Sequence, residues 1–211
     1  MKFSLTRPAV LRLTIDLAAW ARMGNFATIM TTYNNMQQIK RRIFAMRNGI
    51  VADALRKAGS PYRYIMGVNL PQLKEIASEY GTDAALADEL IADTLSRESQ
   101  LIAPMLMPRG EVDADRAENW LRGLTSREAV DVLCHSLLRH EPYAFALARK
   151  MLAGDDVESR YAGLRLLWNL VNTRAAEILP VAESEATRGD DASLKTLAER
   201  LAEEARFMLG L

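Results

Sequence analysis

The chain has 211 residues, of which 27 are Lys or Arg and 27 are Asp or Glu, so its formal net charge is zero. This balance excludes a uniformly basic nucleic-acid binder, because cations would have to gather on one face to attract phosphates. A single cysteine, Cys134, excludes an internal disulfide framework and most cysteine-based metal sites. No apolar run approaches the roughly 18 residues of a membrane span, so we expect no membrane insertion.

Residues 1–35 differ from the rest of the chain because they are basic and almost free of acids. We predict a weakly integrated leader at 1–35 and one helical repeat domain at 36–211. An extra N-terminal helix over 9–21, an organelle transit peptide and a start codon assigned too early are the alternatives. Arg12 and Asp16 interrupt any signal-peptide core.

The next segments carry helix periodicity separated by turn residues. Apolar side chains recur at a 3.6-residue period over 36–58, and Gly59 stops this predicted helix. Residues 62–68 lack a helix period and predict an ordered loop. Pro71 suits the first turn of a second helix, which Gly81 ends, and a third helix is predicted over 83–94.

A short helix over 125–140 is the centre of the predicted fold. Thr125 and Glu128 fit a capping box at its start. One face is apolar, formed by Val130, Leu133, Cys134, Leu137 and Leu138. Beside it runs a polar stripe of Arg127, Asp131 and His135, in which Arg127 and Asp131 at i, i+4 can form an ion pair. We interpret Cys134 as a buried structural thiol.

An internal repeat is the strongest signal in the sequence. Ser-Arg pairs open helical segments at Arg97, Arg127 and Arg160, with partner helices predicted over 113–124 and 142–152 and a last pair over 173–185 and 192–209. Two-helix units of this length are typical of an α-solenoid, in which equivalent residues line one surface. The three arginines either share that concave surface, or each supports a turn or pairs with an acid of the preceding repeat.

Several motifs together resemble the DNA alkylation repair family, the AlkD-like proteins with HEAT-like repeats. The resemblance covers roughly residues 36–209. The motifs are Met36–Arg42 (MQQIKRR), Tyr64–Val68 (YIMGV), Pro71–Ile76 (PQLKEI), Arg97-Glu98, Ala129–Ser136 (AVDVLCHS) and Arg160–Leu167 (RYAGLRLL).

The resemblance implies an all-α fold, an α-solenoid of HEAT-like antiparallel helix pairs that holds duplex DNA in a concave groove. Active members of the family are DNA glycosylases that excise cationic N-alkylated purines such as 3-methyladenine and 7-methylguanine. Asp131 falls at the position of the catalytic carboxylate, and Arg160 falls at that of a phosphate-binding arginine. We add Arg127 and Arg97 as DNA-binding candidates, and we expect no cofactor and no metal.

One departure from the family weakens the enzymatic interpretation. The tryptophan expected four residues before Asp131 is replaced by Arg127, whose charge repels a cationic lesion. We interpret Trp120 and Trp168 as core residues. Two hypotheses therefore stay open: a DNA repair protein with weak or no base excision, and a non-catalytic HEAT-like scaffold for protein or nucleic acid. In either case we expect a cytoplasmic monomer.

Overall fold

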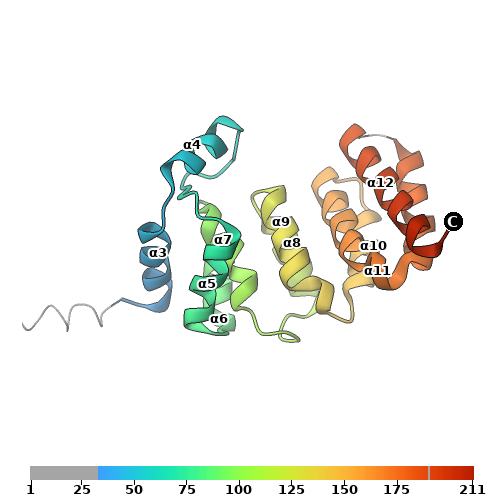
Figure 1. Ribbon diagram of the computed structural model, residues 1–211. Helices are drawn as coiled ribbons and strands as arrows, with labels where there is room; N and C mark the ends of the chain where they lie inside the picture. The colour runs from blue at the N-terminus through green and yellow to red at the C-terminus, as the bar shows by residue number, and fades with distance from the viewer. Residues whose placement is uncertain (1–32, 190) are drawn as a thin grey trace, which may run out of the picture. The chain divides into compact units, whose positions relative to one another are not determined.

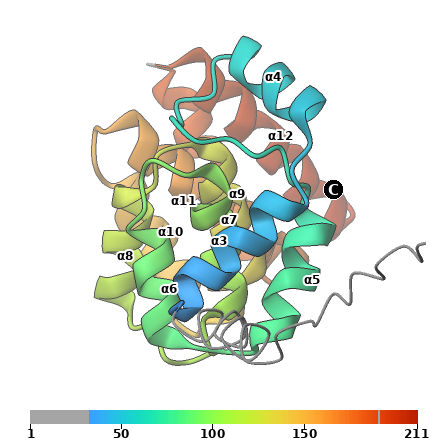
Figure 2. The same ribbon diagram turned by 90° about the vertical axis from the view of Figure 1, so that its left-hand side faces the viewer.

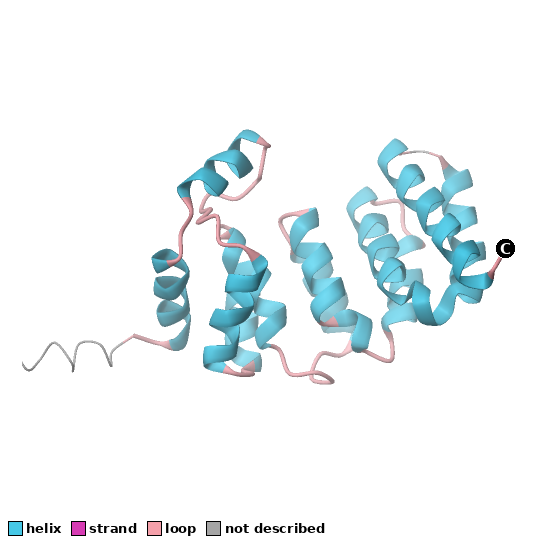
Figure 3. Ribbon diagram, in the orientation of Figure 1, coloured by secondary structure: helices cyan, strands magenta, loops and turns pink. Residues whose placement is uncertain are grey.

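A computed structural model describes residues 33–189 and 191–211. In those ranges every regular element is helical, and an isolated bridge between Tyr64 and Ser96 is the single β-type pairing (Figures 1 and 3). The elements are α3 (Asn35–Ala45), α4 (Gly49–Lys57), α5 (Leu70–Tyr80), α6 (Ala84–Ile91), α7 (Arg97–Leu106), α8 (Ala114–Gly123), α9 (Arg127–Ser136), the 3₁₀ helix η1 (Leu138–His140), α10 (Ala144–Leu152), α11 (Val157–Arg188) and α12 (Ala192–Leu209).

The helices stack in two layers, as the prediction of an α-solenoid of HEAT-like helix pairs requires. Helices α5, α7, α9 and α11 pack side by side, each on the next, and form what we call the inner layer. Helix α6 packs on α7, and α10 packs on both α8 and α11, which completes the second layer (Figure 2). The fold prediction is confirmed. No helix among the described residues is long and apolar enough to cross a membrane.

The predicted leader lies mostly outside the described residues, which begin at 33. Asn35–Leu211 forms one compact unit, and all structural statements below concern that unit. The assignment of 1–35 as a leader therefore stays a prediction.

The helix predicted over 36–58 is two helices, α3 and α4, because Asn48 interrupts it. The Asn48 side chain accepts hydrogen bonds from the backbone N–H groups of Ile50 and Val51 and so caps α4. Gly67 of the following loop lies against this cap with φ +72°, and a Cβ there would come within 2.3 Å of the Asn48 carbonyl oxygen. Only glycine fits this close approach.

The start of α9 also differs from the prediction. Ser126, and not Thr125, is the N-cap, and its hydroxyl accepts a hydrogen bond from the Ala129 N–H at 3.2 Å. Glu128 does not complete a capping box, because its carboxylate binds Arg97 of the preceding repeat at 2.5 Å and 2.8 Å. The pattern of Thr125 and Glu128 correctly predicts a helix start here. It could not show that Glu128 pairs with Arg97, because that residue lies 31 positions away.

The helix predicted over 173–185 is the second half of α11. Arg174 breaks the helical geometry with φ −135° and ψ 30°, and the helix continues beyond this kink to Arg188. Helix α12 packs along α11 and ends the stack.

A large hydrophobic core runs through the stacked layers. It includes the whole apolar face predicted for 125–140, from Val130 to Leu138, and Trp120, which is 8% exposed as expected for a core residue. Trp168 is only partly buried and packs on the edge of this core. The difference between the two tryptophans matters for the site described below.

The repeats are joined by a ladder of ion pairs at the N-terminal ends of the inner helices. A glutamate occupies the second position of α7, of α9 and of α11. These three residues, Glu98, Glu128 and Glu158, are spaced 30 residues apart. Carboxylates are favoured there by the helix dipole. Arg97 binds Glu128, and Arg127 in turn binds Glu158 at 2.9 Å. Each of these two arginines therefore pairs with an acid of the following repeat, whereas the alternative drawn from the sequence was an acid of the preceding repeat.

The ladder also shows that the three Ser-Arg pairs are not in structural register. Arg97 and Arg127 are the first residues of their helices, whereas Arg160 is the fourth residue of α11. Val157 occupies the position equivalent to the other two arginines.

Arg97 is the most buried member of the ladder, and it should be the most important for stability. Its side chain is 6% exposed and lies between Glu98, which is fully buried, and Glu128. We expect Arg97→Leu to lower the free energy of unfolding by about 3–5 kcal/mol, because Glu98 loses its buried cation. Arg127→Leu, at the equivalent but 36% exposed position, should cost only about 1 kcal/mol. Urea denaturation measures both, and equal losses would contradict this ranking.

Candidate nucleic-acid interface

Asp131 projects from the middle of α9 toward α11. Its carboxylate accepts a hydrogen bond from the Tyr161 hydroxyl at 2.9 Å and from Arg165 Nε at 2.6 Å. The side chain is 34% exposed, so it is neither sealed in the core nor freely solvated. Burial raises the pKa of the Tyr161 phenol, and the Asp131 carboxylate raises it further. The phenol therefore stays protonated and acts as the donor.

The sequence allowed an ion pair between Arg127 and Asp131, but the structure does not contain it. The Arg127 guanidinium binds Glu158 and lies over the ring of Tyr161, 4.5 Å from the ring centre. The cation that pairs with Asp131 is Arg165, one repeat further along the chain. The negative charge of the candidate catalytic carboxylate is therefore partly balanced, but by a different residue from the one expected.

Asp131 opens into a cavity of ≈ 650 Å³ between α5, α7, α9 and α11. Trp168, which was predicted to be a core residue, lines this cavity together with Asp131 and Arg165. An aromatic ring thus faces the same space as the carboxylate, although it comes from α11 and not from the position four residues before Asp131. The remaining lining residues are Leu70, Pro71, Lys74, Met105, Val132, His135, Ser136 and Asn169.

A second cavity of ≈ 440 Å³ adjoins the first and shares four of its lining residues. We call the two together the inner groove. Lys74, Arg109, Arg139 and Arg165 supply its positive charge, and Asp131 is the single acid among its described lining residues. A neutral chain therefore concentrates cations on the inner layer, which is the sorting that a nucleic-acid interface needs.

Both histidines of the sequence lie in the inner groove, beside Arg139. Arg139 Nε lies 3.1 Å from His140 Nε2, and Arg139 Nη1 lies 3.5 Å from His135 Nδ1. His135 also contacts the side-chain oxygen of Asn169 at 3.1 Å. The pKa of His140 is lowered by burial and then by the charges of Arg109 and Arg139, so its ring is mainly neutral at pH 7.

Two of the four predicted site residues lie in the interior instead of on the groove. Arg97 is 5% exposed and donates to the Val68 carbonyl as well as to its two glutamates. Arg160 is 1% exposed and its Nε donates to Glu185 at 2.5 Å. Both guanidiniums hold helices together and are not available to a phosphate in this structure. Arg127 and Asp131 are half-buried at the surface, but Arg127 does not line the inner groove.

The groove cations could not be identified from the sequence because none sits in a repeated motif. Lys74 lies within α5, Arg109 follows α7, and Arg139 lies in η1, just after α9. The stacking of the inner layer brings them together.

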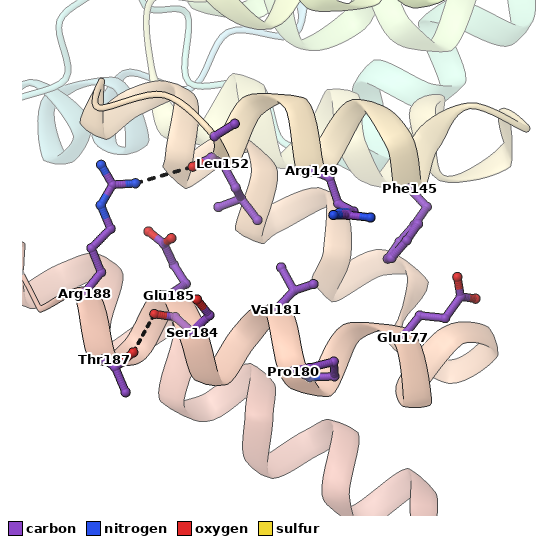
Figure 4. Close-up of a pocket in the computed structure, with 11 residues that line it drawn as sticks. Phe145, Arg149, Leu152, Glu177, Pro180, Val181, Ser184, Glu185, Thr187 and Arg188 are labelled. Atoms are coloured by element: carbon purple, nitrogen blue, oxygen red, sulfur yellow. Dashed lines mark hydrogen bonds between the residues drawn. The ribbon is translucent and has the colours of Figure 1, made fainter.

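A larger cavity of ≈ 840 Å³ lies elsewhere, between α10 and the second half of α11 (Figure 4). It shares no lining residue with the inner groove. Its walls carry Arg149 and Arg188 together with Glu177 and Glu185, and Arg188 is already bound to Asp155 and to the carbonyls of the turn after α10. Mixed and paired charges make it a poorer candidate for an anionic ligand.

The sequence and the fold of this chain resemble known proteins. Residues 39–140 match the family model described as DNA alkylation repair enzyme. A solved structure reported as part of "a new family of proteins related to the HEAT-like repeat DNA glycosylases with affinity for branched DNA structures" superposes with a TM-score of 0.72 at 16% sequence identity, over 84% of this chain and 78% of that chain. No curated protein matches the sequence. Among the described residues no three His, Cys, Asp or Glu side chains gather as metal ligands.

The single cysteine offers a direct check on the packing of α9 behind the groove. Cys134 is fully buried, and burial is the main reason that its thiol pKa is raised. The thiol should therefore stay neutral and unreactive at pH 8. We expect a thiol reagent such as Ellman's reagent to label the native protein negligibly and to label one site after denaturation. Rapid labelling of the folded protein would show that α9 does not pack as described.

Proposed function

We propose that this chain is a DNA-binding protein whose inner groove holds the phosphate backbone. The premise is its membership, through residues 39–140, of the DNA alkylation repair enzyme family. The observation that carries this proposal is the gathering of Lys74, Arg109, Arg139 and Arg165 around a groove with one acid. Phosphate contacts from lysine and arginine supply most of the affinity of such interfaces and release counterions.

The ligand class includes branched as well as continuous duplexes. The structurally similar protein has affinity for branched DNA, and its fold is shared over most of both chains. The cations of the inner groove can bind the phosphates that both kinds of DNA share, so the groove needs no base contacts. Binding through the backbone tolerates both kinds of DNA.

Binding should fall with salt and with loss of the groove cations. We expect Lys74→Gln and Arg139→Gln each to weaken binding several-fold at low salt and to reduce the slope of log K against log salt by about one unit per lost contact. Fluorescence anisotropy with a labelled duplex measures both effects. Lys195→Gln, on exposed α12 outside the groove, is the matched control and should bind like the native protein. Absence of binding to any DNA at low salt would favour the non-catalytic scaffold for a protein partner.

Base excision is the second candidate function, and the shared cavity of Asp131 and Trp168 favours it. A purine carrying an N-alkyl group is already cationic and leaves without protonation. A carboxylate near the sugar stabilises the oxocarbenium charge that develops as the bond breaks. Trp168 offers an aromatic face to the extruded base, which compensates in part for the tryptophan that Arg127 replaces.

The ion pair with Arg165 opposes this second function. Because Arg165 Nε lies 2.6 Å from the Asp131 carboxylate, part of the negative charge is neutralised before a lesion arrives. A cationic base would also meet the guanidinium of Arg165 in the same cavity. We therefore propose that any excision is slower than it would be with an unpaired carboxylate at Asp131.

Release of alkylated bases from methylated DNA tests the second function. We expect Asp131→Asn to abolish any release and Trp168→Ala to reduce it about tenfold or more, while binding to unmodified duplex changes little. Mass spectrometry of the released bases is the measurement, and Trp120→Phe, in the core, is the control for general disturbance. Release that persists in Asp131→Asn would remove Asp131 from the mechanism, and no release from the native protein would leave DNA binding as its function.

A further inference from the structure

Helix α4 is set apart from the core that supports the inner groove. Its one buried side chain, Ala52, belongs to a small separate cluster with Tyr62 and Ile65. In Figure 1 α4 lies above α3 and beyond the N-terminal end of α7. The isolated bridge between Tyr64 and Ser96 joins the loop that follows α4 to the residue before α7. The element therefore presents most of its surface outward.

Large apolar side chains are exposed on and around α4. Ile50, the second residue of the helix, is 85% exposed, Phe44 at the end of α3 is 53% exposed, and Tyr64 in the following loop is 46% exposed. A contiguous exposed apolar patch rimmed by polar residues is typical of an interaction surface. Within the described part of the chain, these three side chains are not part of either hydrophobic core.

Arginines stack on two of these apolar groups, Phe44 and Tyr64. Arg47 lies over the Phe44 ring at 4.2 Å, and Arg63 lies over the Tyr64 ring at 5.4 Å. Both arginines line a cavity of ≈ 490 Å³ beside α4 together with Arg56, and no acid lines it. Arg47 and Arg63 form no ion pair within the described part of the chain, so their charges stay available.

Asp53 is the acid nearest to this cavity on α4, and it is already engaged. Its carboxylate binds Arg56 at 2.8 Å, and Arg56 also donates to the Ile65 carbonyl. The amide groups at the start of α4 are capped by Asn48, so they do not offer a separate anion site. Arg47 and Arg63 are the groups left to bind an anion here.

Apolar and aromatic side chains beside unpaired arginines fit nucleic acid with an open base stack. Aromatic and aliphatic side chains stack on exposed bases without regard to sequence, and arginines hold the adjacent phosphates. A continuous duplex buries its base faces and offers only the phosphates. A nick, a branch point or an end offers both.

We infer that the surface formed by Phe44, Arg47, Ile50, Arg63 and Tyr64 binds the exposed base-pair face at a discontinuity in duplex DNA. This inference rests on the proposed function, because the inner groove supplies the general affinity for the duplex. The α4 surface adds a preference for DNA whose stacking is interrupted.

The test compares two duplexes of equal length, one continuous and one with a central nick or branch, in competition anisotropy at moderate salt. Native protein should prefer the interrupted duplex. Ile50→Gln and Arg63→Gln should each reduce this preference about fivefold or more while leaving affinity for the continuous duplex within about twofold. Phe207→Gln and Arg200→Gln, exposed on α12, are matched controls for an apolar and a cationic change.

The outcomes separate the two proposals. Loss of preference confined to the α4 variants supports the inference, and loss of affinity for both duplexes in the Lys74 and Arg139 variants supports the groove. If the native protein binds both duplexes equally, or the α4 variants keep its preference, the inference is overturned while the groove stands. Binding of anionic lipid vesicles that depends on Arg47 and Ile50, without any preference among DNAs, would also overturn it. Circular dichroism confirms that each variant remains folded.

Discussion

The pairing of an arginine at the start of one inner helix with a glutamate at the start of the next organises the rest of the structure. Arg97 binds Glu98 in its own helix and Glu128 in the following one, and Glu98 accepts hydrogen bonds from the Met66 and Gly67 amides. One ion cluster therefore fixes the loop after α4, the start of α7 and the start of α9. A solenoid has few long-range contacts between non-adjacent repeats, so such links between neighbours set its register.

This ladder also explains how a neutral chain can present a basic groove. The arginines and glutamates of the ladder neutralise one another at the N-terminal ends of the inner helices. Further along these helices, Lys74, Arg109 and Arg139 face a groove with little opposing charge. Charge is thus paired where it supports the fold and largely unpaired along the inner groove.

Asp131 stands between these two arrangements. It lies on the polar flank of α9, as the sequence indicated, and opens into the groove beside Trp168. Its partner Arg165 comes from α11. The same pair that orients the carboxylate lowers its capacity to stabilise a positive transition state, which is a physical reason to place DNA binding ahead of base excision in this chain.

The sequence by itself indicated most of the helices and most of their ends, the apolar face of 125–140, a resemblance to the DNA alkylation repair family and the place of Asp131 on the polar flank of its helix. These depend on local periodicity, capping residues and ordered short motifs. The sequence did not determine which arginines are accessible. Arg97 and Arg160 each follow a serine at a helix start, which predicted a surface position. The stacking of repeats instead buries both against glutamates 31 and 25 residues away. Nor could the sequence place Trp168 on the cavity or gather Lys74, Arg109 and Arg139. Those outcomes depend on which helix faces pack together across repeats, and only the tertiary structure decides that.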